Sequence, residues 1–133
     1  ERVDQTIGAR YVPVGYVDAM ERAYAAADLM LARAGAGTVV EVATVGLPAI
    51  MVPLPIGNGE QARNAKPLVD ASAAICIDDA ELTADRLVSE VTALFAAPGK
   101  LAAMSAAAQK LMRPDAAARV AHVVLDAAQA GER

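Results

Sequence analysis

The sequence predicts an α/β fold, a Rossmann-like doubly wound parallel sheet, on three observations. Short apolar runs of strand length alternate with stretches that carry apolar residues at helical spacing. Glycine or proline follows several of these runs, as expected where a strand or helix ends. The 133 residues suffice for one domain with its own core. Strands separated by helices in this alternation run parallel, with helices on both faces of the sheet.

The strands and helices are expected in a regular order. Four apolar runs predict strands at residues 10–14, 29–32, 49–52 and 74–77. A first helix follows the capping-box spacing of Asp18 and Glu21, and further helices are expected at 38–45, 60–70, 83–96, 98–112 and 114–130. Gly46 should stop the second helix, whereas Pro67 should kink the third or end its first part.

Composition excludes several classes of function. Hydrophobic residues make up 56% of the chain, yet no uninterrupted apolar run is long enough to span a bilayer. A net charge of −4 and 3% aromatic residues argue against a nucleic-acid surface, so no nucleic-acid partner is expected. The single cysteine, Cys76, is expected to be a buried thiol in a reducing, cytoplasmic setting.

The segment from Arg33 to Thr38 is the strongest candidate for a binding site. Gly35, Ala36, Gly37 and Thr38 form a turn of small residues between a predicted strand and a predicted helix. Backbone N–H groups at a helix start have no intrahelical partner, and the helix dipole adds partial positive charge. Such a turn can hold a phosphate without a basic side chain, although ordinary strand-to-helix turns also look like this. Arg33 either pairs with a phosphate or braces the turn by bonding carbonyls.

Three further groups of residues have competing interpretations. By spacing, Thr38 to Glu41 is a complete capping box, which gives Glu41 a structural role. Gln61 and Asn64 share one helix face, either a solvated one or one that points into a cleft at the carboxyl end of a strand. His122 is expected to be structural or at the surface, and Asp78 and Asp79 to form a solvated loop.

The motifs in the first half resemble the donor-binding half of the MurG-type glycosyltransferases, GT-B enzymes of glycosyltransferase family 28. The matching pieces are R-x-G-A-x-T-x-x-E at residues 33–41, G-L-P-A-I-x-V-P at 46–53 and G-N-G-E-Q-x-x-N-A at 57–65. Residues 15–20 and 23–28 also fit, and the motif matches thin out after about residue 78. The resemblance implies an inverting transferase that uses UDP-GlcNAc as donor and a lipid-linked muramoyl-pentapeptide as acceptor, making lipid II from lipid I in peptidoglycan synthesis.

The resemblance also assigns roles along the donor. It places the uracil near Tyr16 and Val17, with Met20 lining the same pocket, and the ribose hydroxyls on Glu41. The diphosphate would bind the backbone of residues 35–38, and Gln61 and Asn64 would bind the GlcNAc hydroxyls. Glu60 stands where this family often has Gln or His, and Gly37 where a larger residue is common, so side-chain contacts at both positions are open. The alternatives are a core or rim position for Tyr16 and a core position for Met20.

By the same resemblance, residues 1–133 form an incomplete UDP-GlcNAc-binding C-terminal domain. The chain begins at Glu1, so we expect the acceptor domain, the linker and the first strand of the donor domain to lie outside it. The general base and the membrane contact would belong to that acceptor domain, at the inner face of the cell membrane. No cofactor or obligatory metal is expected in this domain.

Other readings of the motifs differ in chemistry. Gly35-x-Gly37 begins like a dinucleotide fingerprint, but Val40 stands at the third glycine and no acidic residue follows at the expected distance. Another GT-B enzyme, such as a UDP-GlcNAc epimerase, would share the sugar-binding amides. A non-catalytic nucleotide-sugar module that needs a partner chain is the third alternative.

Overall fold

The computed structural model describes residues 11–131. Its centre is a three-stranded parallel sheet of β1 (Met30–Ala32), β2 (Ala49–Met51) and β3 (Ala74–Cys76), in that order. The helices are α1 (Met20–Ala26), α2 (Ala36–Val45), α3 (Glu60–Asp70), α4 (Ala84–Ala96), α5 (Lys100–Leu111) and α6 (Ala116–Gly131), and a 3-10 turn η1 spans Asp79–Glu81. The predicted Rossmann-like α/β class is confirmed.

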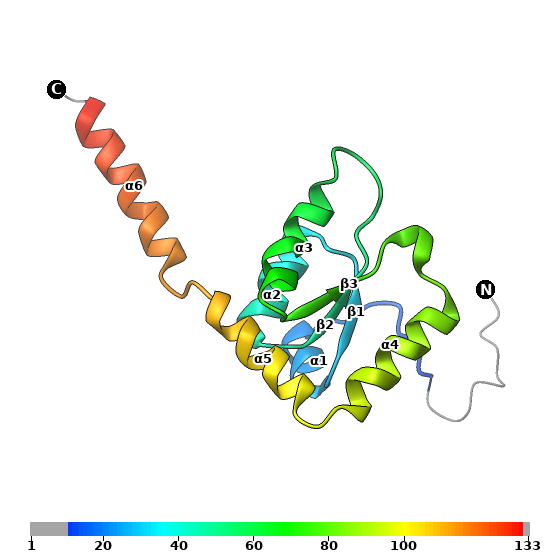
Figure 1. Cartoon of the computed structure of the whole chain (residues 1–133). Helices are drawn as coiled ribbons and strands as arrows, with labels where there is room; N and C mark the ends of the chain where they lie inside the picture. Colours follow the sequence, from blue (N-terminus) through cyan, green and yellow to red (C-terminus); the bar gives the residue numbers. More distant parts are fainter. Residues whose placement is uncertain (1–10, 132–133) are drawn as a thin grey trace.

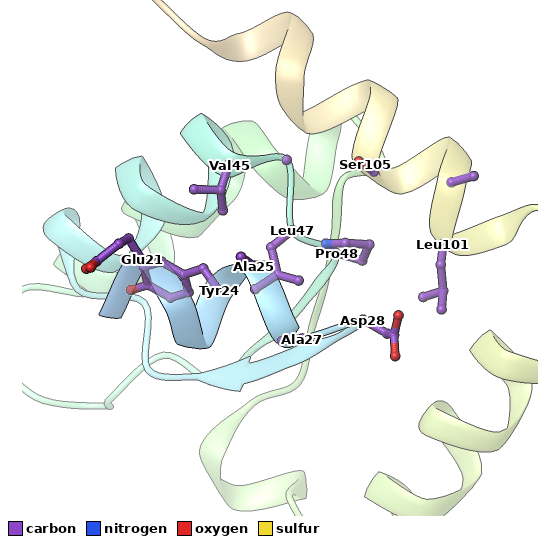
Figure 2. Close-up of a pocket in the computed structure, with 12 residues that line it drawn as sticks. Glu21, Tyr24, Ala25, Ala27, Asp28, Val45, Leu47, Pro48, Leu101 and Ser105 are labelled. Atoms are coloured by element: carbon purple, nitrogen blue, oxygen red, sulfur yellow. The ribbon is translucent and has the colours of Figure 1, made fainter. Parts of the chain in front are cut away.

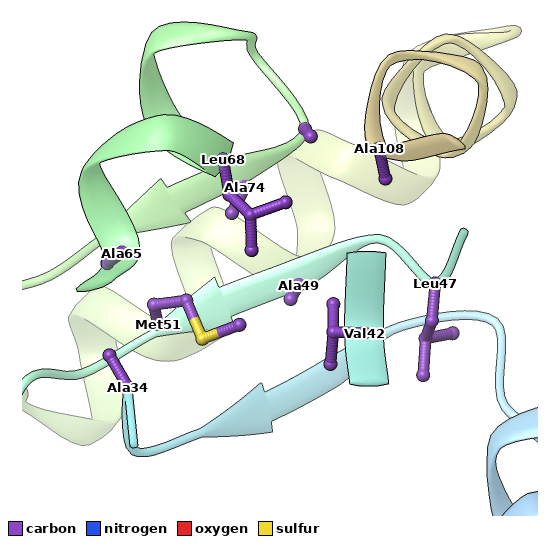
Figure 3. Close-up of a cluster of buried hydrophobic side chains, with 10 residues drawn as sticks. Ala34, Val42, Leu47, Ala49, Met51, Ala65, Leu68, Ala74 and Ala108 are labelled. Atoms are coloured by element: carbon purple, nitrogen blue, oxygen red, sulfur yellow. The ribbon is translucent and has the colours of Figure 1, made fainter. Parts of the chain in front are cut away.

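Packing on both faces of β2 makes this strand the middle of the core. Ala49, Ile50 and Met51 are each 0% exposed, although neighbouring residues in a strand point to opposite faces. One buried cluster joins β2 to α2, α3 and α5; its members are Ala34, Val42, Leu47, Ala49, Met51, Ala65, Leu68, Ala73, Ala74 and Ala108 (Figure 3). On the opposite face lies a second cluster, made of Ile50, Val52, Ile77, Leu94 and Met104.

Helices at the edges are less buried. α1 and α6 bury none of their residues, and α6 extends away from the rest of the molecule (Figure 1). No single helix in the described range is long and apolar enough to cross a membrane. Taken together, the helical residues 84–96 and 100–131 have the length and composition of a membrane span, but the two parts are bent by 94° relative to each other.

Several predicted elements need correction. Tyr11 to Val14 are not a strand; they are exposed, and no described strand pairs with them, while Arg10 lies outside the described residues. β1 was expected to be buried, but Leu31 is 45% exposed because β1 pairs with β2 alone among the described strands. The first capping box does not form, since the N-cap of α1 is Ala19 and no side chain caps it.

Pro67 neither ends nor divides α3, which runs unbroken through it. Proline removes one backbone hydrogen bond, but Ala65 and Leu68 on either side are each 1% exposed and anchor the helix in the core. Packing of an apolar face therefore outweighs the local preference.

Gly46 ends α2 as predicted. It adopts φ +68°, and the next N–H, that of Leu47, donates to the Val42 carbonyl at 3.1 Å. A Cβ built on Gly46 would lie 2.8 Å from Cγ of Gln109 on α5. The turn thus needs glycine for its backbone angle, whereas the clash with Gln109 involves a flexible side chain that can move aside.

We expect Gly46→Ala to lower the free energy of unfolding by about 1–3 kcal/mol, because alanine is strained at positive φ and meets Gln109. Urea unfolding would measure the change. Gly37→Ala is the matched control within α2, because nothing lies within 4 Å of its added Cβ. Equal stability of Gly46→Ala and wild type would contradict this account of the turn.

Candidate functional site

Three loops meet at one edge of the sheet. Ala32, Met51 and Cys76 are paired in register at the carboxyl ends of their strands. The segments that follow are the turn into α2, the loop at 52–59 and the segment leading into η1. In open parallel sheets this edge is where ligands bind.

Arg33 links these loops. Its Nη1 donates to the Val52 carbonyl at 3.3 Å and also pairs with Asp79 Oδ1 at the start of η1. Of the two predicted roles, the structure shows the bracing one. Asp79 is therefore more than part of a solvated loop, which corrects the prediction for this residue.

The side chains of Gln61 and Asn64 each form a hydrogen bond with the backbone of a loop outside α3. Gln61 Oε1 accepts a hydrogen bond from the Leu54 N–H at 2.9 Å, and Asn64 Nδ2 donates to the Ala34 carbonyl at 3.2 Å. Both side chains are partly buried, so they do not form a simple solvated helix face. Nε2 of Gln61 and Oδ1 of Asn64 have no hydrogen-bond partner among the described residues.

The start of α2 differs from the predicted one. Gly35 is the N-cap, without a side-chain cap, so the helix begins two residues earlier than expected and Thr38 lies inside its first turn. Thr38 and Glu41 therefore form no capping box. Ala36 and Gly37 are exposed, and nothing lies within 4 Å of a Cβ added at Gly37, which leaves open space beside the first turn.

Glu41 instead contacts α1. Its Oε2 accepts a hydrogen bond from the Tyr24 hydroxyl at 2.6 Å. This hydrogen bond raises the pKa of Tyr24 above 10.0, and burial and the charge of Glu41 act in the same direction. The contact joins residues 17 apart on different helices, so no local spacing signalled it.

A hollow of about 310 Å³ lies beside this contact, between α1 and α2. It is lined by Met20, Glu21, Tyr24, Val40, Glu41, Thr44 and Val45. Met20 is 38% exposed and lines the hollow with Glu41, so it is not a core residue. Tyr16 is 80% exposed and Val17 37% exposed on the segment before α1, so Tyr16 is not a core residue, and its rim alternative stays open.

The remaining predicted residues lie apart. Glu60 is exposed in the first turn of α3. His122 is exposed on α6, with Nδ1 2.7 Å from the Ala118 carbonyl. Cys76 is half-buried rather than buried; burial and the nearby Asp78 raise the pKa of its thiol.

A second hollow, of about 440 Å³, lies at the opposite edge of the sheet. Figure 2 shows it between α1, the turn from α2 into β2, and α5. Its lining includes Asp28, Pro48 and Leu101. Because it faces the amino ends of the strands, it is separate from the three loops described above.

Comparison with known families decides between the readings of the motifs. A family model described as the glycosyltransferase family 28 C-terminal domain matches residues 3–120. The chain belongs to this family. A dehydrogenase reading of Gly35-x-Gly37 is thereby set aside.

Family 28 relatives and a solved structure resemble the chain closely. A UDP-N-acetylglucosamine--N-acetylmuramyl-(pentapeptide) pyrophosphoryl-undecaprenol N-acetylglucosamine transferase from Nocardioides is 56% identical over 119 residues. That match covers 90% of the chain and 33% of the relative. The enzyme of the same name from Mycolicibacterium smegmatis is 55% identical over 123 residues, which cover 92% of the chain and 32% of the relative.

The crystal structure of Acinetobacter baumannii MurG superposes with a TM-score of 0.77 at 33% identity. The superposition covers 85% of this chain and 34% of the MurG chain. The family 28 chain thus spans about a third of the length of the relatives it matches.

We expect the Tyr24 hydroxyl to titrate above pH 10.0, because tyrosinate formation beside Glu41 is disfavoured. The difference in absorbance at 295 nm between wild type and Tyr24→Phe isolates this titration. Glu41→Gln should shift the midpoint downward. The raised pKa stabilises the fold below pH 10.0, and this contribution is lost as the pH rises through the folded-state value. A midpoint at or below 10.0 would show that the hydroxyl does not donate to Glu41.

Proposed function

We propose that this chain is the donor-binding domain of an inverting N-acetylglucosaminyltransferase. It binds UDP-GlcNAc and, within a longer protein, serves transfer of GlcNAc to a lipid-linked muramoyl-pentapeptide, making lipid II from lipid I. The observation that carries the proposal is the meeting of three family 28 motifs at the carboxyl edge of the sheet, joined by Arg33, Gln61 and Asn64. The names of the relatives supply the donor and acceptor.

The order of the site residues supports this assignment. The hollow beside Glu41 suits a nucleoside, since Met20 in its lining offers apolar surface for uracil and the Glu41 carboxylate accepts ribose hydroxyls. Tyr16 and Val17, exposed on the segment just before α1, are proposed to add to the uracil contact. The first turn of α2, at residues 35–38, lies next and takes the diphosphate on its N–H groups. Asn64 contacts the turn before α2 from α3, so its helix brings Gln61 and Glu60 to the GlcNAc end.

The chemistry proposed for this half concerns the leaving group. The acceptor hydroxyl attacks the anomeric carbon from the face opposite UDP, the bond from that carbon to the diphosphate oxygen breaks, and negative charge grows on the phosphate. N–H dipoles of residues 36–38 are already oriented toward that charge and stabilise it, so we propose no obligatory metal or other cofactor in this domain.

The acceptor proton passes to a base in the acceptor domain, which would lie outside residues 1–133. That domain would also supply contact with the inner face of the cell membrane. Two partners are therefore proposed, the nucleotide sugar for this domain and the lipid-linked acceptor for the other. No role in binding nucleic acid is proposed, given the net charge of −4.

A protein-observed NMR titration with UDP-GlcNAc, UDP-glucose, UDP and NADH, without added metal, tests donor binding. We expect the largest shifts with UDP-GlcNAc, at Tyr16, residues 35–41 and residues 61–64, because these surround the proposed ligand. Shifts with NADH alone, or none with any uridine nucleotide, would overturn the proposal.

We expect Gln61→Ala to lower the preference for UDP-GlcNAc over UDP by roughly threefold to tenfold, since one or two hydrogen bonds to the sugar are lost. Gln61→Glu keeps an acceptor for the Leu54 N–H but loses the amide donor, and so separates sugar binding from loop bracing. Arg63→Ala, at an exposed neighbour, is the control. Calorimetric titration with both nucleotides gives the ratio, and an unchanged ratio in both Gln61 variants would remove Gln61 from the sugar site.

A further inference from the structure

The hydrogen bond between Tyr24 and Glu41 is a side-chain contact between α1 and α2 at the proposed nucleoside site. The Tyr24 ring extends from α1 toward α2 (Figure 2), and its hydroxyl lies 2.6 Å from Oε2 of Glu41. Tyr24 was not among the residues predicted from the sequence to contact the donor. Tyr24 also lines the hollow beside Glu41, so it can act on a ligand held there through its contact with Glu41.

The surroundings of Glu41 leave it few other partners. The lining of the hollow contains a second carboxylate, Glu21, and no lysine or arginine. The Thr44 hydroxyl donates within its own helix to the Val40 carbonyl at 2.8 Å. Among the residues that line the hollow, Tyr24 is the one whose hydroxyl donates to Glu41.

A hydroxyl and a cationic side chain leave different parts of the Glu41 carboxylate available to a ligand. An arginine would occupy both carboxylate oxygens and neutralise the charge. The tyrosine hydroxyl donates one hydrogen bond to Oε2, which fixes the carboxylate while Oε1 and the negative charge remain available to donors of a ligand. Two neighbouring hydroxyls, as on an unmodified ribose, are suitable donors for such a carboxylate.

We propose that Tyr24 is a positioning residue that holds Glu41 for the ribose diol and thereby sets the preference for ribonucleotides over 2′-deoxyribonucleotides. This inference rests on the proposed function, since it takes Glu41 as the ribose acceptor. At neutral pH the phenol of Tyr24 is protonated and can donate to Glu41.

The test uses the protein at the full length of its gene, with wild type, Tyr24→Phe and the control Tyr11→Phe. Tyr11 is 60% exposed and does not line the hollow, so Tyr11→Phe removes a hydroxyl away from the contact. For Tyr24→Phe we expect the KM for UDP-GlcNAc to rise roughly threefold to tenfold with kcat nearly unchanged, because ground-state and transition-state binding lose the same ribose contact.

Competition with UDP and 2′-deoxy-UDP separates positioning from packing. Tyr24→Phe should weaken UDP by roughly threefold to tenfold but 2′-deoxy-UDP by much less, so the discrimination falls. In a Glu41→Ala background the same substitution should have almost no further effect on UDP, since the carboxylate it positions is absent.

Equal weakening of UDP and 2′-deoxy-UDP would mean that Tyr24→Phe only loosens the packing of α1 on α2, and would overturn the inference. Unchanged affinities and KM would overturn it as well. If wild type binds neither UDP nor UDP-GlcNAc, the proposed function fails and the inference fails with it, an outcome distinct from the other two.

Discussion

The parallel register of three short strands is the constraint on which the rest of the structure depends. Because β1, β2 and β3 are paired in step, Ala32, Met51 and Cys76 lie level and their three following segments leave the sheet side by side. Complete burial of β2 on both faces fixes this register, since a slip by one residue would exchange the two clusters that it fills. The contacts of Arg33 with Val52 and Asp79, and that of Asn64 with Ala34, cross between segments that this register brings together.

Those crossing contacts give the polar side chains two tasks. Gln61 Oε1 accepts from the Leu54 N–H and Asn64 Nδ2 donates to the Ala34 carbonyl, so both loops are held in place by contacts within the protein. The remaining polar atoms of the two amides are then already oriented. On the proposed assignment, a site arranged in this way would lose little conformational freedom when a sugar nucleotide binds, which favours affinity without a large interface.

The sequence was sufficient for most of the helices and strands, including the exposed helix α6, which was predicted at 114–130 and spans Ala116–Gly131. β2, α2, α3 and α4 follow from apolar periodicity and end signals; α4 begins one residue later than predicted, because Thr83 is its N-cap and its side chain accepts from the Arg86 N–H at 3.1 Å. Local signals failed where tertiary packing opposed them, as at Pro67, or where none of the described strands pairs with the segment, as at residues 11–14. The contacts of Glu41 and Asp79 could not be predicted, because Tyr24 and Arg33 are 17 and 46 positions away on other elements.

Because of the charges around the candidate site, phosphate binding would depend mainly on backbone N–H groups. Arg33 is the basic residue of the turn before α2, yet its guanidinium already pairs with Asp79 and bonds the Val52 carbonyl. Glu21 and Glu41 add negative charge at the nucleoside end, and the chain as a whole carries −4. Long-range attraction of a diphosphate is therefore weak, and the partial positive charge at the start of α2 acts only within about one helical turn. On the proposed assignment, the nucleotide must be held by short-range contacts, with uracil and ribose between α1 and α2 bringing the diphosphate within reach of the exposed N–H groups of residues 36–38.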